Sequence, residues 1–219
     1  ADGSIIPQIA QKERLPLIFS RIVDNASALL LAFYIVQRGD ILLADLVQAG
    51  LNDAIILSMN KVGTEVNVNL LYLILFPVAK TVSQDRNTSM IKMIAPLAQL
   101  ASKCAELILT TPKAATCLSL LLHIFTPGST DPNEEVLYKD CFNALGDTID
   151  QIYQKNVLCP SQFESVLQMV DWASKSYDCV KKAMKQSQGF KKAIENAVDK
   201  CNDAKLKMYY SEILKTLLD

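Results

Sequence analysis

The residues best suited to chemistry in this sequence are six cysteines and a single histidine. The cysteines occur at Cys104, Cys117, Cys141, Cys159, Cys179 and Cys201. None of them forms a Cys-x-x-Cys pair, and one histidine in the chain gives little support for a zinc site. Free cysteine behaves as a small hydrophobic residue, so we expect buried, reduced thiols. Such thiols are typical of an intracellular protein, and we predict a cytoplasmic or nuclear location and no bound metal.

Catalytic patterns are absent from the sequence. It contains no glycine-rich phosphate loop, no Gly-Lys-Ser/Thr, no His-Glu-x-x-His and no EF-hand loop. His123 lies within the apolar run Leu120–Phe125, where a lone histidine is typical of a core or helix-end position rather than of a general base. Asp147 and Asp150 share a helix face, but no neighbouring residue completes a site. We therefore predict a protein that is not an enzyme and that holds no cofactor.

Charge is distributed unevenly along the chain. The net charge is −1, which excludes a strong overall attraction to DNA or to a membrane surface. From Trp172 to Asp219, however, ten lysines and six acidic residues give +4, and the preceding part carries −5. The basic end fits a polar partner, although lysine-rich outer faces of helices are also common.

Aromatic residues accompany the lysines of this basic end. The candidate partner-binding residues there are Trp172, Tyr177, Lys181, Lys182, Lys185, Tyr209 and Tyr210. Aromatic anchors with a polar rim are typical of protein-binding sites, but the same pattern also fits core aromatics with lysines outside. Nucleic-acid binding is the weaker alternative, because no arginine follows Arg86 and arginine is favoured for phosphate contacts.

The elements that must position these residues read as helices throughout. Half of the residues are hydrophobic and 21% are charged, which is typical of an ordered globular chain. The stretch Asn25–Asn60 contains three apolar segments, separated at Gly39 and Gly50, where glycine ends one helix before the next begins. No run reaches the ~20 apolar residues that span a bilayer, so we predict no membrane insertion.

Further breaks divide the rest of the chain into helices. We expect helix starts near 64, 112 and 161, with Thr64 and a Ser161–Glu164 capping box at two of them. Prolines at Pro77 and Pro96 predict kinks or breaks. The predicted organisation is an N-terminal extension over 1–16 and one domain over 17–219, with 126–133 as the alternative boundary. The start at Ala1 without methionine suggests a piece of a longer protein.

The segment Leu43–Met59 resembles the armadillo repeat. That family has a short second helix that ends in an Ala-Gly turn, here Ala49-Gly50, followed by a third helix with apolar residues at helical spacing. Ala28–Gly39 and Glu65–Ala79 resemble the third helices of neighbouring repeats, so the likeness covers about residues 25–80. It implies an all-α fold, a right-handed superhelix of armadillo-like repeats. A compact helical bundle is the alternative.

The resemblance also implies a groove that binds a partner. In the family, an asparagine on each third helix holds an extended peptide, whereas this chain has Ile35 and Pro77 at those positions. This departure favours a helix-in-groove contact or a contact through a repeat-end surface, and Tyr34, Tyr72 and Leu75 are the candidates near the groove. We therefore predict a non-catalytic scaffold domain of a larger protein that binds a peptide or helix of another protein. Self-association into a homodimer and nucleic-acid binding by the lysine-rich end are the alternatives.

Overall fold

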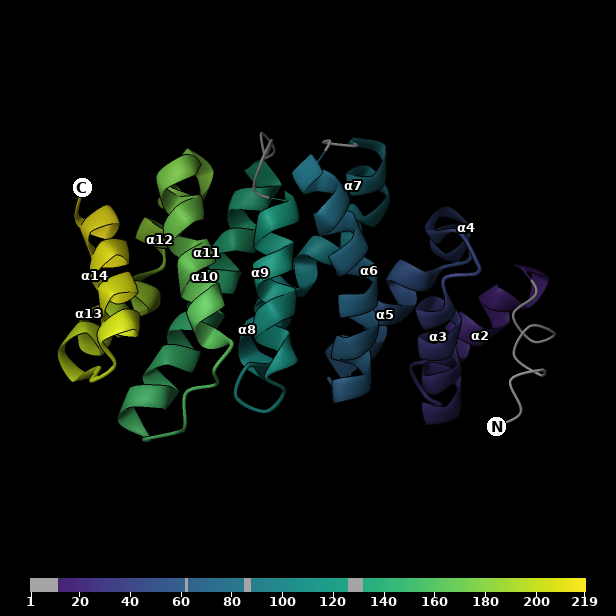
Figure 1. The fold of residues 1–219 in the computed structure, drawn as a ribbon, viewed down its shortest axis with the longest axis horizontal. Helices are drawn as coiled ribbons and strands as arrows, with labels where there is room; N and C mark the ends of the chain where they lie inside the picture. The colour runs from purple at the N-terminus through teal and green to yellow at the C-terminus, as the bar shows by residue number, and fades with distance from the viewer. Residues whose placement is uncertain (1–11, 62, 85–87, 126–131) are drawn as a thin grey trace. The chain divides into compact units, whose positions relative to one another are not determined.

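A computed structural model describes residues 12–61, 63–84, 88–125 and 132–219. Every regular element in these ranges is a helix, and no strand occurs in them (Figure 1). The predicted all-α class is therefore confirmed. The chain divides into two compact units, an N-terminal unit, Ala1–Leu97, and a C-terminal unit, Ala98–Asp219.

The division between the units falls at a predicted break. It lies within the 3-10 helix η2, Ala95–Gln99, which contains Pro96. Most of the alternative boundary at 126–133 lies outside the described residues. At the start of the N-terminal unit, the 3-10 helix η1 covers Lys12–Arg14. Helix α2 then begins at Leu15, whose side chain is fully buried. The single domain over 17–219 remains a prediction.

The N-terminal unit contains six α-helices within its described residues. They are α2 (Leu15–Arg21), α3 (Ala26–Arg38), α4 (Leu43–Gln48), α5 (Leu51–Lys61), α6 (Glu65–Gln84) and α7 (Thr88–Ile94). Asn25 begins α3, because its side-chain oxygen accepts from the amides of Ser27 and Ala28. Gly39 and Gly50 have φ values of 68° and 96°, a conformation that only glycine adopts easily. The predicted stops at both glycines are confirmed.

Helix α6 is the centre of the N-terminal unit. It packs against α3 and α5, and its start follows the sequence: the Thr64 and Asn67 side chains cap each other's backbone amides. Pro77 lies inside the helix, which continues to Gln84. One face of α6 is buried, whereas Phe76 on the other face is 50% exposed.

The C-terminal unit contains seven α-helices within its described residues. They are α8 (Leu100–Leu107), α9 (Lys113–Phe125), α10 (Pro132–Gln154), α11 (Phe163–Ser176), α12 (Asp178–Gln186), α13 (Gln188–Lys200) and α14 (Ala204–Leu218). Asp203 caps α14 by accepting from the amides of Lys205 and Leu206. The predicted Ser161–Glu164 capping box is wrong, because the Ser161 hydroxyl donates to the Gln162 side chain and α11 begins at Phe163.

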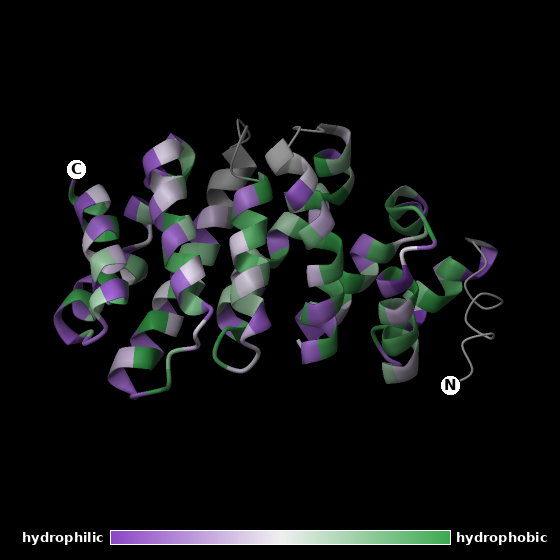
Figure 2. Cartoon of the chain, in the orientation of Figure 1, coloured by the Kyte–Doolittle hydropathy of each residue, from purple (hydrophilic) through white to green (hydrophobic). Residues whose placement is uncertain are grey.

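The helices of the C-terminal unit pack in two rows. One row consists of α8, α10 and α13, since α10 contacts both α8 and α13. The other consists of α9, α11 and α14, since α11 contacts both α9 and α14. The two rows are joined where α8 packs on α9 and where α13 packs on α14. These helices carry both hydrophobic and hydrophilic residues, as an amphipathic helix must when one side is buried (Figure 2). Helices α10 and α13 approach closely at Gly146 of α10, where an added Cβ would lie 2.9 Å from the Phe190 backbone of α13. Beside it, the rings of Phe142 and Phe190 are 5.1 Å apart.

Candidate functional site

Three aromatic rings meet on the C-terminal unit. The Trp172 ring lies 5.5 Å from the Tyr177 ring at an interplanar angle of 74°, which is an edge-to-face contact. On its other side, Trp172 lies 6.1 Å from the His123 ring. The Trp172 side chain is nevertheless 39% exposed. The contacts with Tyr177 and His123 hold the Trp172 ring in place, while a large part of its apolar surface remains open to solvent.

The ends of three helices position this group. His123 lies in the last turn of α9, and Trp172 in the last two turns of α11. Tyr177 is the extended residue between α11 and α12: its amide donates to the Ala173 carbonyl and its carbonyl accepts from the Lys181 amide. Because residues four apart lie on one face of a helix, Lys181 and Lys185 point to the same side of α12.

The α12 lysines lack the ion pairs that some other lysines of the C-terminal unit make. Lys175 pairs with Asp171 and Glu212, while Lys205 lies 2.7 Å from Glu164. For Lys181, Lys182 and Lys185, by contrast, no carboxylate lies within 4 Å in the part of the chain that the structure describes. We call Trp172, Tyr177, Lys181, Lys182 and Lys185 the aromatic–lysine patch. It offers apolar anchors together with positive charge that forms no ion pair among the described residues.

Two predicted partner-binding residues are not available at the surface. Tyr210 is fully buried, and its hydroxyl lies 3.3 Å from the Tyr153 hydroxyl; burial raises the pKa of Tyr210. Leu75 is also fully buried, because it lies on the core side of α6. The predictions that Tyr210 and Leu75 bind a partner are therefore corrected. For Leu75 the reason is that apolar periodicity alone does not tell which side of a nearly all-apolar helix faces the core. Tyr209 is half-buried on α14, and among the described residues its ring makes no contact with the rings of the patch.

The remaining predicted residues lie on two adjacent helices of the N-terminal unit. Tyr34 of α3 is 43% exposed, and its ring contacts Phe33 at 5.7 Å. On α6, the rings of Tyr72 and Phe76 stack at 5.4 Å. Leu30, one turn before Tyr34, is exposed as well. Because α3 packs on α6, we call Leu30, Tyr34, Tyr72 and Phe76 the α3–α6 apolar row.

Sequence reasoning missed residues that belong to these two surfaces or contact them. Phe76 could have been found, because it follows Tyr72 by four residues and so shares its helix face. His123 was correctly expected at a helix end, but its contact with Trp172 joins helices α9 and α11, which are distant in the sequence. No local pattern encodes such a contact.

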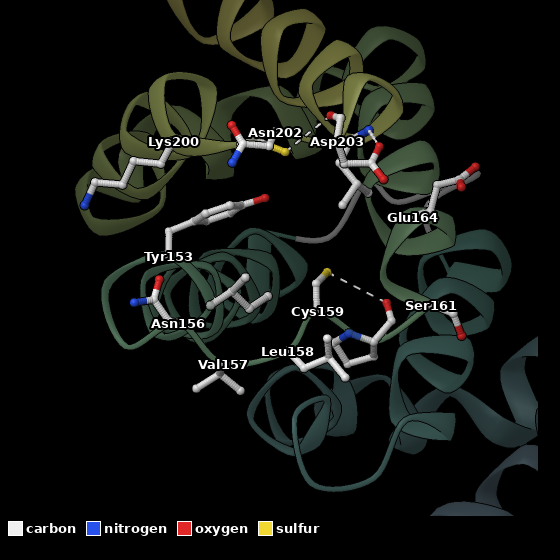
Figure 3. A pocket seen from close by; sticks show the side chains of 14 residues that line it. Tyr153, Asn156, Val157, Leu158, Cys159, Ser161, Glu164, Lys200, Asn202 and Asp203 are labelled. Atoms are coloured by element: carbon white, nitrogen blue, oxygen red, sulfur yellow. Dashed lines mark hydrogen bonds between the residues drawn. The ribbon is translucent and has the colours of Figure 1, made fainter.

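A separate cavity of about 700 Å³ lies between two connections of the C-terminal unit (Figure 3). One is the non-helical segment between α10 and α11, and the other is the short junction between α13 and α14. Tyr153, Cys159, Cys201 and Asp203 are among the lining residues. Burial, with the nearby Cys201 and Asp203, raises the pKa of the Cys159 thiol to about 11.

All six cysteines are free thiols, as predicted. Cys104, Cys117 and Cys141 are completely buried in the helical core. Burial raises the pKa of Cys117 and of Cys141 to about 12, so these thiols are protonated at neutral pH and act as small apolar side chains. Across the described residues, no group of three or more His, Cys, Asp or Glu side chains is arranged to hold a metal ion.

Asp147, which the sequence offered as part of a carboxylate pair, lines a second cavity of about 370 Å³ between α8 and α10. Glu106 and Asp140 line the same cavity. Asp150 is not among its lining residues, so the two aspartates do not form a shared site there.

Comparisons with protein-family models, with curated proteins and with solved structures found no match. The armadillo resemblance therefore depends on residues 25–80 of this chain alone and remains a prediction. Within the described residues, none of the helices combines the length and the apolar character needed to cross a bilayer.

Proposed function

We propose that this chain is a non-catalytic protein-interaction module, built as a right-handed superhelix of armadillo-like repeats within a larger protein. The observation that carries the proposal is the aromatic–lysine patch, where the 39% exposed Trp172 contacts the Tyr177 ring and the helix that follows Tyr177, α12, carries three lysines. Tryptophan and tyrosine are enriched among the residues that contribute most to protein-binding energy. Their rigid rings bury a large area at a small loss of conformational entropy.

The charge of the patch selects the chemistry of the partner. Lys181, Lys182 and Lys185 have no carboxylate partner among the described residues, so an acidic segment would gain attraction without displacing an existing ion pair. The partner we propose is a peptide or helix of another protein, with one large apolar side chain for Trp172 and Tyr177 and acidic residues around it.

The α3–α6 apolar row supports a binding role for the N-terminal unit as well. Its members are apolar or aromatic, with Tyr34 43% and Phe76 50% exposed. Exposed apolar side chains on adjacent helices are typical of a surface that receives an amphipathic helix. A second copy of this chain is the alternative occupant of this row. Two binding surfaces on one chain suit a scaffold.

Site-specific crosslinking tests the proposal in cells. A photoreactive benzoylphenylalanine replaces Tyr177 in the full chain, and captured chains are identified by mass spectrometry. We expect one polypeptide to be captured at this position and to be lost when Lys181, Lys182 and Lys185 are all changed to Glu. Lys92→Glu, at an exposed position of the N-terminal unit, is the matched charge control.

The outcomes separate the competing functions. Equal capture from a probe at Leu57, an exposed residue of α5 outside both surfaces, would contradict specific binding. Capture that survives the triple charge reversal would remove the role of the lysines. Crosslinks to nucleic acid that disappear steeply with added salt would instead favour the nucleic-acid alternative.

A further inference from the structure

Two thiols line the 700 Å³ cavity of the C-terminal unit. Cys159 belongs to the segment between α10 and α11, and Cys201 is the residue that ends α13. In Figure 3 the Cys159 side chain points from its segment towards the interior of the cavity, on the side of Tyr153. Both thiols donate to nearby backbone carbonyls, Cys159 to Pro160 and Cys201 to Asp203. Neither thiol contributes to the aromatic–lysine patch.

Cys201 lies close enough to Cys159 to affect its titration, since it is one of the groups that raise the pKa of Cys159. Both cysteines also raise the pKa of Tyr210. Cys201 is among the groups that raise the pKa of Tyr153, whose hydroxyl lies 3.3 Å from the Tyr210 hydroxyl. Tyr153 lines the cavity together with both thiols, so Cys159 and Cys201 share one space beside this tyrosine.

The backbone at both positions is outside the helices, where small movements are least costly. Residues 156–160 have no regular structure, and Asn156 has a φ of 50°, which releases the chain from α10. Cys201 is extended, with φ −73° and ψ 123°. A disulfide needs Cα atoms roughly 4.4–6.8 Å apart and suitable Cβ directions. Because neither cysteine lies inside a helix, the proposed disulfide requires these two connections to adopt this geometry.

From this arrangement we propose that Cys159 and Cys201 are an oxidation site that forms an intramolecular disulfide and fastens the α10–α11 segment to the α13–α14 junction. The oxidant is hydrogen peroxide. Cys159, the less buried of the two thiols, reacts first, through the small thiolate fraction that its raised pKa leaves: an S–O bond forms, the O–O bond breaks, and water leaves, so that Cys159 becomes a sulfenic acid. The buried Cys201 thiol then attacks that sulfur; the S–S bond forms, the S–O bond breaks, and a second water leaves.

Peptide mapping of the full chain tests this site. After hydrogen peroxide treatment and tryptic digestion without reductant, we expect the peptides 156–175 and 201–205 to be linked and to separate with dithiothreitol. Cys159→Ser and Cys201→Ser must each abolish the linked pair, with Cys201→Ala as the substitute if serine at this buried position prevents folding. Cys179→Ser must retain it, because that half-buried thiol lies outside the cavity.

Other products would overturn the proposal. These are Cys159 carried to sulfinic acid while Cys201 remains a thiol, a link from Cys159 to Cys179, or a link between two copies of the chain. An unmodified Cys159 in a chain whose Cys179 has oxidised would overturn it equally. None of these outcomes bears on the aromatic–lysine patch, so the oxidation site and the proposed binding function fail or succeed separately.

Discussion

Gly146 tests the packing of the C-terminal unit, because α10 and α13 approach closely at this residue. An added Cβ would meet the Phe190 Cα and N atoms at 2.9 Å and the Gly189 carbonyl carbon at 3.2 Å. Optimal contacts between carbon atoms are about 3.5–4.0 Å, so α13 would have to move by about 0.6–1 Å. Such a shift disturbs the Phe142–Phe190 ring pair and the hydrogen bond from the Ser187 hydroxyl to the Lys139 carbonyl.

Two opposing terms set the size of the effect of Gly146→Ala. Replacing glycine by alanine inside a helix stabilises by about 1 kcal/mol. Overpacking a filled contact costs about 1–3 kcal/mol, and a rigid backbone neighbour places this case near the upper end. We expect a net loss of about 1–2 kcal/mol in the free energy of unfolding, since the clash exceeds the gain in helix propensity. For a chain of this size that is a fall in Tm of roughly 2–8 °C.

Gly189→Ala is the matched control, because it makes the same substitution on the facing helix. An added Cβ at Gly189 meets no atom within 4 Å, so only the helix propensity remains. We expect this variant to be unchanged or up to about 1 kcal/mol more stable. Urea unfolding of both variants, followed by circular dichroism, measures the difference. If Gly146→Ala is stabilised as much as Gly189→Ala, the close approach of α10 and α13 is wrong.

Three further predictions follow from particular residues. Asp203→Ala should destabilise the chain by about 1 kcal/mol in urea unfolding, because α14 loses its cap; Asp199→Ala, an exposed change that removes no cap, should not. Alkylation of Cys159 by iodoacetamide should accelerate about tenfold per pH unit between about pH 7 and 10, since the thiolate reacts and the pKa is raised to about 11; a plateau near pH 9 would contradict this. Phe76→Ser should leave the free energy of unfolding within about 0.5 kcal/mol but weaken capture of a partner by the α3–α6 apolar row, whereas Leu57→Ser should leave both unchanged.

The sequence was sufficient wherever a local rule sets the outcome. Gly39 and Gly50 end helices because their positive φ is easy only for glycine. Thr64 begins α6 as predicted, because its cap partners lie within one turn. The Ser161 prediction failed for a related reason: a capping pattern names suitable residues, but whether the helix starts there depends on how Phe163, which is fully buried, packs.

The candidate surfaces also combine features that the sequence predicts with features that only the tertiary structure shows. From the sequence, the aromatic and lysine residues after Trp172 were identified as a set, and their composition already favoured a protein partner over nucleic acid. Only the tertiary structure separated exposed Trp172 from buried Tyr210, since both are aromatic residues in helices of mixed polarity. The side of a helix that faces the core depends on which other helices it meets.

By itself, the sequence determined that the chain folds into helices and where several of them begin and end. These properties follow from backbone conformations, caps and hydrophobic periodicity, which act over a few residues. The tertiary structure decided that His123, Trp172 and Tyr177 meet, that Leu75 is buried, and that Cys159 and Cys201 share a cavity. Each of these depends on contacts between residues distant in the chain, which form only when the helices pack.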